Sequence, residues 1–409
     1  MGIKPQERMV WDGNMAAAQA MRQAQVDVVA AYPITPSTPI VENYSKFVAD
    51  DAVNKGQFVM VESEHSAMSA CVGASAAGGR VATATSSQGY ALMVEVLYQA
   101  SGMRLPIVLN VVNRALASPL NIHGDHSDMY LGRDAGWINL CAFNSQDAYD
   151  LNFVAFKVAE DMNVRLPVAV NQDGFLTSHT QEVLETFSNE DAVNFIGEYK
   201  QKNPMLDPAN PVTYGAQTEG EWHFEHKMRQ NHALVHSQAI VERVFEEFEA
   251  YSGRKYESVE SYKMEDADEA IMVIGSAVGT TQLAVDKLRE QGRKVGMIAI
   301  RLWRPFPKAE VAEAIKNLKS LAVLDRSAPM GTTGALYNEV TAVMVQYGIS
   351  INILDYIYGL GGRDTTYEQI SEVYNDLEAC TKAGKRVKPV LQTINLRGKD
   401  LHFYEEGAK

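Results

Sequence analysis

The sequence predicts an α/β protein made of two units, each built around a mostly parallel sheet. Short apolar runs alternate with helical patterns over residues 1–200, and a second alternation begins near residue 270. These runs contain few polar residues, which is typical of parallel strands that helices cover on both faces. A chain of 409 residues is also long enough for two or three domains.

Five strands and two intervening helices are predicted in the first unit. The strands are Val26–Tyr32, Phe58–Val61, Val81–Thr85, Ile107–Asn113 and Pro167–Asn171, of which the last is expected to close the sheet. The helices are Ser66–Gly79, rich in small residues, and Tyr90–Ser101. Ligands of parallel sheets bind at the carboxyl ends of the strands. The unusual turns PITPST, SSQG and NRALASP all fall at those ends.

A long connection follows the first sheet. Lys200–Glu221 contains three prolines and little periodicity, so we expect an extended segment on the surface. An amphipathic helix comes next and stops near Gly253, with an apolar face made of Leu234, Val241, Val244, Phe245 and Phe248. Residues 1–258 are predicted to form one domain, with the connection and helix at 200–258, and residues 259–409 the other.

The second unit is predicted from four further apolar runs. They are Ala270–Ile274, Val295–Ile300, Leu321–Leu324 and Ile351–Leu354, with a helix between the first two that ends at Gly292. The turn GSAVGT before this helix could hold a phosphate. It lacks the third glycine of a dinucleotide fingerprint, and Arg301 stands where an acidic residue would end the next strand. Close strand–helix packing is therefore favoured over a nicotinamide site.

Composition narrows the function. A net charge of −14, with scattered Lys and Arg, opposes nucleic-acid binding. The first residues do not form a signal peptide, and no apolar run reaches the ~18–20 residues that span a bilayer, so a cytoplasmic protein is expected. Only Cys71, Cys141 and Cys380 occur, far apart in sequence. Buried reduced thiols are predicted rather than zinc or iron–sulfur ligands.

Three groups of polar residues are candidates for chemistry. The segment NIHGDHSD, at 121–128, could be a metal site, a solvated loop or a loop that faces a substrate. Glu62 and Glu64 precede a helix, where capping alone would favour at least one of them. Arg114 ends an apolar strand, where it could meet an anionic ligand or form a structural salt bridge.

Taken in order, the motifs of this chain resemble the alpha chains of pyruvate:ferredoxin oxidoreductases, in the multi-subunit branch of the 2-oxoacid:ferredoxin oxidoreductase family. The resemblance covers almost the whole chain. It rests on YPITPST (32–38), ESEH (62–65), SSQG (86–89), NRA (113–115), GDHSD (124–128), DGF (173–175), RPFP (304–307), DR (325–326) and GLGGRD (359–364).

The resemblance implies a thiamine diphosphate enzyme and a division of labour between chains. The first domain would be the pyrimidine-binding half of the cofactor site, and the second would resemble the carboxy-terminal domain of transketolases. A beta subunit would supply the pyrophosphate half and Mg²⁺. Gamma and delta subunits would carry the [4Fe–4S] clusters and part of the coenzyme A site, so this chain is expected to hold no metal itself.

The resemblance also implies roles for single residues. Glu64 would hydrogen-bond N1′ of the pyrimidine and so promote removal of the C2 proton of the thiazolium. Arg114 would hold the substrate carboxylate. Thr35 would line the substrate pocket, and Pro33 would shape the turn beneath the cofactor. The candidates near the substrate, without separate roles, are His65, Asp125 and His126.

The expected reaction is the reversible, coenzyme A-dependent oxidative decarboxylation of pyruvate to acetyl-CoA and CO₂, with electrons passed to ferredoxin. An enzyme for 2-oxoisovalerate or 2-oxoglutarate is the alternative within the family. A non-catalytic scaffold with a transketolase-like fold is the alternative from another class. That scaffold would be expected to lose Glu64 and Arg114, and both are present.

Overall fold

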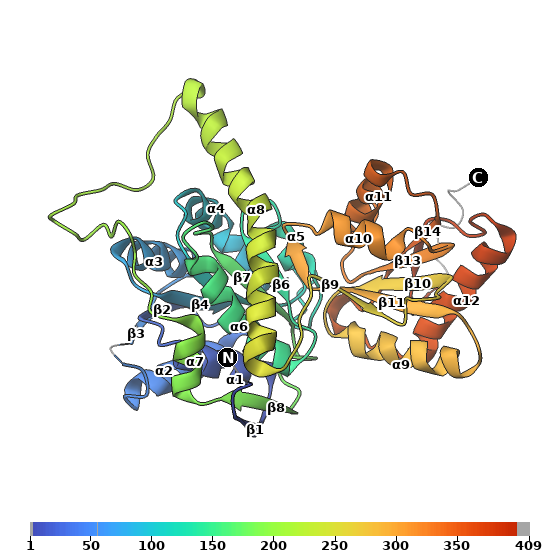
Figure 1. The fold of residues 1–409 in the computed structure, drawn as a ribbon, viewed down its shortest axis with the longest axis horizontal. Helices are drawn as coiled ribbons and strands as arrows, with labels where there is room; N and C mark the ends of the chain where they lie inside the picture. Colours follow the sequence, from blue (N-terminus) through green and yellow to red (C-terminus); the bar gives the residue numbers. More distant parts are fainter. Residues whose placement is uncertain (1–2, 55, 399–409) are drawn as a thin grey trace.

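The computed structural model describes residues 3–54 and 56–398, which form two α/β units lying side by side (Figure 1). The first unit contains a seven-stranded sheet in the order β12-β6-β7-β5-β4-β2-β3, parallel except for β12. The strands are β2 (Val28–Ala31), β3 (Gln57–Met60), β4 (Val81–Thr85), β5 (Ile107–Asn113), β6 (Ile138–Cys141), β7 (Val168–Asp173) and β12 (Leu302–Arg304).

Helices cover both faces of this sheet. Side chains of a strand point alternately to its two faces, and in β5 Val108 and Val112 join one apolar cluster whereas Leu109 and Val111 join another. The first cluster includes residues of α1 and α6, and the second includes residues of α3 and α4. The helices are α1 (Gly13–Gln23), α2 (Thr38–Ala49), α3 (Glu64–Ala77), α4 (Ser87–Gly102), α5 (Ser127–Leu131), α6 (Ser145–Glu160) and α7 (Asn189–Ile196).

A two-stranded antiparallel sheet and a long helix complete the first unit. Strand β1 (Gln6–Trp11) pairs with β8 (Glu182–Phe187) in antiparallel register. After the extended connection, α8 (Gly220–Ser252) runs for 33 residues and ends at Gly253, as the sequence predicts. Its second half buries Val241 and Phe248, whereas its first half projects from the body of the unit (Figure 1). The predicted helix after the connection is confirmed, and its amphipathic spacing marks the half that packs on the first unit.

The second unit has a six-stranded sheet in the order β15-β14-β13-β10-β11-β9, parallel except for β9. Its strands are β9 (Val259–Tyr262), β10 (Glu269–Val273), β11 (Val295–Ile300), β13 (Ser320–Asp325), β14 (Asn352–Ile357) and β15 (Leu391–Thr393). Its helices are α9 (Ala277–Glu290), α10 (Lys308–Ile315), α11 (Ala335–Tyr347), the 3₁₀ turn η1 (Leu360–Gly362) and α12 (Tyr367–Ala383). One apolar cluster fills this unit.

The predicted α/β class and all nine predicted strands are confirmed to within a few residues. The expectation that Pro167–Asn171 closes the first sheet was wrong, because β7 lies between β5 and β6. Strand β6 is too short to give a clear periodic pattern in the sequence. Strand β12 joins the sheet from beyond residue 300, and a local sequence pattern does not reveal such a distant pairing. The division predicted between residues 258 and 259 stays a prediction. The second sheet begins at Val259, but β12 crosses back to the first.

In the described part of the chain, no helix combines the length and the apolar character needed to cross a membrane.

Two buried carboxylates fasten the start of α11 to the second sheet. Asp325 accepts hydrogen bonds from the backbone N–H of Leu336 (2.9 Å) and Tyr337 (3.0 Å). Asp355, on the neighbouring strand, accepts one from Gly334 N–H at 2.6 Å. Burial raises the pKa of Asp325 to about 6. Burial, with repulsion from Asp325, raises the pKa of Asp355 to about 7.

These values predict a pH-dependent effect of Asp355→Asn. Between pH ~4, the unfolded value for Asp, and pH ~7, the folded chain holds a proton that the unfolded chain releases, so the wild type loses stability as the pH rises. A neutral amide does not titrate. We expect the stability of the variant relative to wild type to rise by about 2 kcal/mol from pH 5 to pH 8, measured by urea unfolding. Parallel pH profiles for the two proteins would contradict this assignment.

Candidate active site

The carboxyl edge of the first sheet gathers the polar turns found in the sequence. Strands β2, β3, β4, β5 and β7 are parallel, so the segments that follow them share one edge. These segments carry Thr35, Glu64, Ser86, Arg114 and, as the last residue of its strand, Asp173. The predicted placement of the motifs at the strand ends is confirmed.

Glu64 begins α3 and is 6% exposed. The side-chain cap of this helix is Ser63, which accepts from Ser66 N–H at 3.2 Å. Ser63 rather than Glu64 therefore supplies the side-chain cap, although Glu64 stands in the first turn, where the helix dipole favours a carboxylate. Glu62 is exposed. Among the described residues, the Glu64 carboxylate has no hydrogen-bond partner. A buried carboxylate without a partner is costly in a protein that evolved only to fold.

The surroundings of Glu64 fit a ligand with hydrogen-bonding ring atoms. Helix α4 approaches so closely at Gly89 that a Cβ there would lie 2.6 Å from Glu64 Oε1 and 2.5 Å from Thr85 Oγ1. Any side chain at position 89 would push both groups away. The hydroxyls of Thr85 and Ser86 are buried and also lack partners within the described part of the chain. Three polar groups without partners therefore occupy the region where β4 ends and α3 and α4 begin.

Arg114 is a buried cation held by neutral groups. Its Nη1 donates to Thr35 O at 2.8 Å and its Nε to Asn121 O at 3.1 Å, so the guanidinium has a fixed orientation. The side chain forms no salt bridge with the described residues, so the structural ion pair considered for it is not observed. Burial lowers its pKa, an effect that the carboxylate of Asp128 opposes. An arginine still keeps its charge, and an anionic ligand would compensate it.

Asp128 joins the turns that follow β4 and β5. Its Oδ2 accepts from Ser87 N–H at 2.8 Å and Arg114 N–H at 2.9 Å, and its Oδ1 from Asn113 Nδ2 at 3.0 Å. Burial raises the pKa of Asp128 to about 6, although these donors favour the charged form. The residue is 0% exposed and positions the Arg114 backbone. It serves the fold of the site and leaves no oxygen free for a metal.

His126 lies at the contact between the two units. Its Nε2 is 2.7 Å from Asp173 Oδ1, and both side chains are buried. Asp173 Oδ2 also accepts from Arg326 Nη1 at 2.7 Å, and from the backbone N–H (2.9 Å) and hydroxyl (2.5 Å) of Ser276. Burial favours the neutral acid, but His126 and Arg326 outweigh it and hold the pKa of Asp173 well below its usual range. We name these four residues the interdomain carboxylate cluster.

This cluster explains the glycine-rich turn GSAVGT. The turn does bind an anion at the start of α9, as such turns can. The anion is the side chain of Asp173 from the other unit, so the preference for packing over a nicotinamide site agrees with the structure. Asp173 and Arg326 occur in motifs that the resemblance uses, but no role for them followed from the sequence. The available signal was an acidic residue at the end of a strand that begins with an apolar run.

The other predicted site residues form no hydrogen bond with Glu64 in the described part of the chain. Asp125 accepts from Ser127 N–H (2.9 Å) and Ser127 Oγ (2.5 Å), at the first residue of the short helix α5. The ring of His65 is 43% exposed on α3, with Nε2 at 3.6 Å from Glu95 Oε2. Pro33 is exposed in the turn that leads to Thr35. Among the described residues, no three His, Cys, Asp or Glu side chains gather as metal ligands.

Comparisons with known proteins identify the family. Residues 19–246 match the family described as "Pyruvate flavodoxin/ferredoxin oxidoreductase, thiamine diP-bdg", and residues 267–370 match "Pyruvate:ferredoxin oxidoreductase core domain II". The chain belongs to the pyruvate:ferredoxin oxidoreductase family. It is 48% identical to the pyruvate synthase subunit PorA of Thermotoga maritima, over 90% of this chain and 94% of that one. It is 44% identical to PorA of Pyrococcus furiosus, over 94% and 96%.

Relatives that are named for another substrate have slightly lower sequence identity to this chain. The ketoisovalerate oxidoreductase subunit VorA of Pyrococcus horikoshii is 41% identical, over 95% of this chain and 98% of that one. Among solved structures, a 2-oxoglutarate:ferredoxin oxidoreductase from Magnetococcus marinus matches with TM-score 0.71 and 21% identity, over 91% of this chain and 65% of that one. A split-gene transketolase matches with TM-score 0.51 and 11% identity, over 91% and 97%. Both structures support the predicted fold.

The interdomain carboxylate cluster predicts a large effect of Arg326→Met on stability. The change leaves Asp173 buried and charged with His126 and Ser276 only, and breaking a buried pair typically costs about 3–5 kcal/mol. We expect a loss of this size in urea unfolding. Lys287→Met is the control, because its partner Glu290 and Lys287 itself are largely exposed, and such pairs contribute about 0–1 kcal/mol. Equal losses in the two variants would show that the cluster does not hold the units together.

Proposed function

We propose that this chain is the alpha subunit of a pyruvate:ferredoxin oxidoreductase, also called pyruvate synthase. The complex would convert pyruvate and coenzyme A to acetyl-CoA and CO₂, reversibly, and pass two electrons to ferredoxin. The observation that carries the proposal is the Glu64 carboxylate, which is buried at the carboxyl edge of the first sheet and has no hydrogen-bond partner among the residues that the structure describes. The chain belongs to a family whose matching domain binds thiamine diphosphate, so this cofactor is the expected partner of that carboxylate.

In this proposal, the chain supplies the pyrimidine half of a thiamine diphosphate site. The cofactor provides the carbon nucleophile and the electron sink that decarboxylation of a 2-oxoacid needs. Glu64 would share a proton with N1′ of the pyrimidine, which makes it the positioned acid–base group of the half-site. The backbone at Gly89 packs closely against this carboxylate and so limits its movement. The hydroxyls of Thr85 and Ser86 supply further hydrogen-bonding capacity beside it.

Arg114 and Thr35 would bind the substrate. The guanidinium is oriented by the carbonyl groups of Thr35 and Asn121, and its charge is left for the carboxylate of the 2-oxoacid. Thr35 would line the pocket on the turn that Pro33 begins. His65, Asp125 and His126 stay candidates for the surroundings of the substrate. Of these, His126 would act through the interdomain carboxylate cluster rather than by contact.

Partner subunits would supply the rest of the enzyme. We assign the pyrophosphate half of the site and Mg²⁺ to a beta subunit, and the [4Fe–4S] clusters and part of the coenzyme A site to gamma and delta subunits. The cysteines of this chain support that division. All three are buried and unpaired, and burial raises the pKa of Cys71 to about 12, which disfavours the thiolate that binds iron. Unpaired thiols also fit a reducing compartment such as the cytoplasm.

Pyruvate is the proposed substrate because the relatives named pyruvate synthase are 48% and 44% identical, against 41% for the ketoisovalerate relative. The alternative is therefore a 2-oxoisovalerate enzyme. Comparison of kcat/KM for pyruvate, 2-oxoisovalerate and 2-oxoglutarate in the assembled complex decides between them. A scaffold without activity is disfavoured, since Glu64 and Arg114 are both present and both lack a charged partner in the described structure.

Arg114→Lys is expected to impair substrate use in the assembled enzyme. Lysine keeps the charge but cannot donate to Thr35 O and Asn121 O while presenting a planar fork to a carboxylate. We expect kcat/KM for pyruvate to fall about 10- to 100-fold, with thiamine diphosphate binding near wild type. Arg133→Lys, at an exposed arginine, is the matched control. Unchanged kinetics with a lower melting temperature would assign Arg114 a purely structural role.

Glu64→Gln tests the proposal most directly. Glutamine is nearly isosteric and keeps a hydrogen-bond acceptor, but it has little affinity for a proton. We expect exchange of the cofactor C2 proton with D₂O to slow by about 10²- to 10⁴-fold, as general acid–base contributions usually do. Stability should change by no more than about 1 kcal/mol. Glu62→Gln, two residues away at an exposed position, should leave exchange unchanged.

Equal exchange rates in wild type and Glu64→Gln would refute the assignment of Glu64, and with it the proposed half-site.

A further inference from the structure

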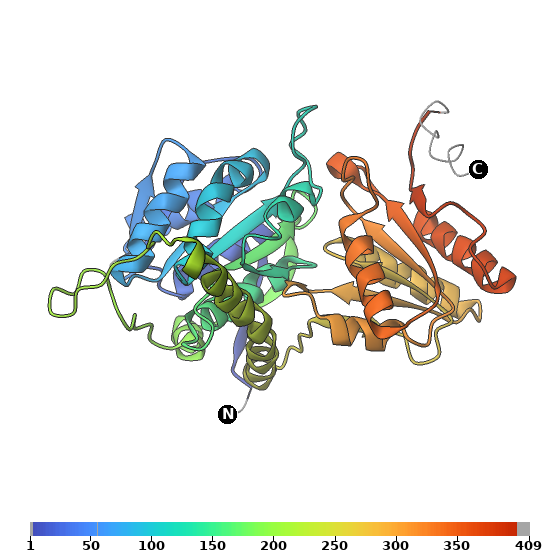
Figure 2. The same ribbon diagram turned by 90° about the horizontal axis from the view of Figure 1, so that it is seen from above.

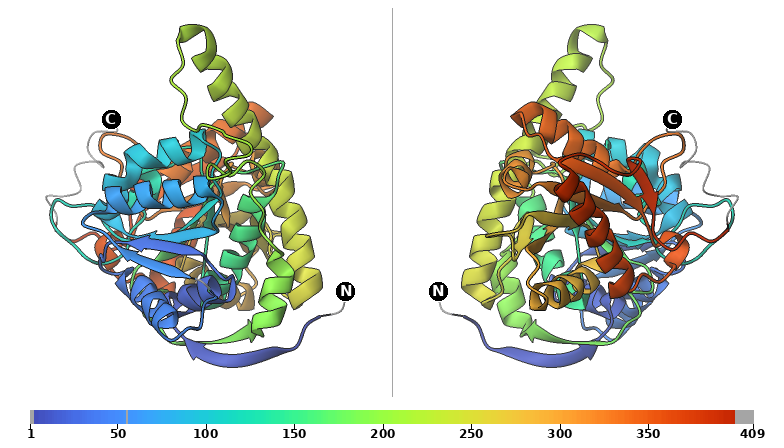
Figure 3. Two further views of the ribbon diagram at one scale, coloured as in Figure 1. Left: turned by 90° about the vertical axis from the view of Figure 1, so that its left-hand side faces the viewer. Right: turned by 90° about the vertical axis from the view of Figure 1, so that its right-hand side faces the viewer.

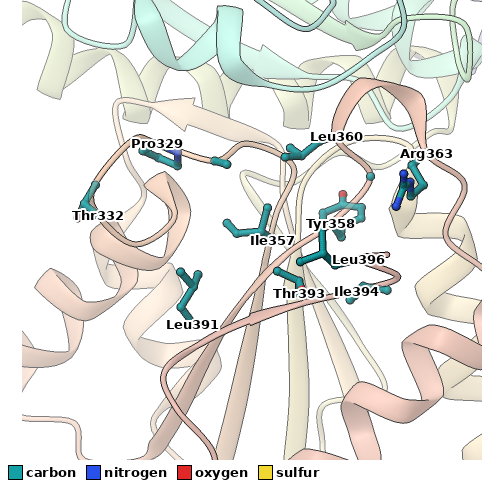
Figure 4. A pocket seen from close by; sticks show the side chains of 12 residues that line it. Pro329, Thr332, Ile357, Tyr358, Leu360, Arg363, Leu391, Thr393, Ile394 and Leu396 are labelled. Carbon is teal, nitrogen blue, oxygen red and sulfur yellow. The ribbon is translucent and has the colours of Figure 1, made fainter. Parts of the chain in front are cut away.

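An apolar pocket lies at the carboxyl edge of the second sheet (Figure 4). Its volume is about 370 Å³. Its lining comes from the ends of β14 and β15, from the loop before α11 and from the segment around η1. Arg363 is the one charged residue among the described residues that line it. The aliphatic lining residues include Ile357, Leu360, Leu391 and Leu396, which suit an apolar side chain rather than a charged ligand.

Apolar side chains of the pocket and of the segments next to it are exposed to solvent. Met330, on the loop before α11, is 93% exposed, and Leu360 and Leu396 are each 38% exposed. The loop after β5 adds Leu120 at 74% and Ile122 at 41%. Both this loop and the segment after β15 project from the same side of the molecule (Figures 2 and 3). We name the pocket and these five residues the edge patch.

Two hydrogen bonds connect the edge patch to the candidate active site. Arg114 Nε donates to Asn121 O at 3.1 Å, and Asn121 Nδ2 donates to Gly361 O at 3.1 Å. Gly361 has φ +59° and packs so closely that a Cβ would lie 2.4 Å from Asn121 Nδ2. Leu360, the residue before Gly361, lines the pocket. The edge patch is therefore connected, through Asn121 and Gly361, to Arg114, the residue proposed to bind the substrate.

One hydroxyl in the pocket lacks a partner. Tyr358 is 3% exposed, and its OH has no hydrogen-bond partner within the described part of the chain. Scattered single apolar residues are ordinary on protein surfaces, but exposed apolar residues on the segments next to an apolar pocket are typical of an interaction site. Figure 4 shows Leu360 and Pro329 above the pocket and Leu396 and Thr393 below it.

We propose that the edge patch docks the subunit that supplies the pyrophosphate half of the cofactor site, and that an apolar side chain of that subunit fills the pocket. This rests on the proposed function, because a subunit that completes the half-site must approach the carboxyl edge of the first sheet. Standard interfaces bury ~800 Å² on each partner, more than this pocket offers. The pocket therefore acts as an anchor within a wider interface.

The test uses this chain coexpressed with its partner subunits. Met330→Asp and Leu360→Asp place a charge on the edge patch at exposed positions, so the isolated chain should melt as the wild type does. We expect binding of the partner subunit to weaken by about 10-fold or more, measured by titration and by native mass spectrometry of the complex. Val345→Asp is the matched control, since Val345 is 84% exposed near the far end of α11.

Wild-type affinity in both Asp variants would overturn the proposal. Loss of self-association of the isolated chain, with partner binding intact, would also overturn it, because the occupant would then be a second copy of this chain. A wild-type complex that assembles without pyruvate turnover would contradict the proposed function instead. The Met330→Asp titration would still decide whether the edge patch docks the partner.

Discussion

The arrangement of the two units depends on one buried carboxylate, Asp173, whose charge neither unit could stabilise alone. His126 comes from the first unit, and Arg326 and Ser276 come from the second. A carboxylate this deeply buried would cost several kcal/mol without such partners. If the units separated, the Asp173 carboxylate would become exposed to solvent or would stay buried without its partners. The cluster therefore fixes both the contact between the two units and the geometry of that contact. The pairing of β12 with β6 adds a backbone connection between the same two units.

Asp173 is also connected to the backbone around Arg114, through the next residue in the chain, Gly174. Gly174 donates its N–H to Asn113 O at 3.0 Å, and Asn113 Nδ2 donates to Asp128, which accepts from the Arg114 N–H. Each step is a buried hydrogen bond, and packed polar networks of this kind have few alternative arrangements. The second unit therefore helps to fix the position of Arg114 without contacting it. This gives the second unit a physical role in the half-site.

Local sequence patterns predicted what local physics determines. The strands Val81–Thr85, Ile107–Asn113 and Val295–Ile300 match β4, β5 and β11 residue for residue, because each is a fully buried run between turn residues. The edge that carries Glu64 and Arg114 followed from the rule for parallel sheets. The partners of Asp173 did not, since they lie 47, 103 and 153 residues away in sequence. For the same reason, β12 was not predicted to join the first sheet.

The contrast between satisfied and unsatisfied charges separates the scaffold from the site. Three other buried or largely buried arginines have carboxylates at 2.5 or 2.6 Å, in the pairs Arg80–Glu160, Arg254–Asp150 and Arg301–Asp147. The buried acids Asp325 at the end of β13 and Asp355 within β14 accept backbone N–H groups instead. Glu64 and Arg114 depart from this pattern, as neither has an oppositely charged partner in the described structure. A fold that satisfies its other buried charges this well would have no reason to retain these two unpaired, so their partners are expected to be ligands.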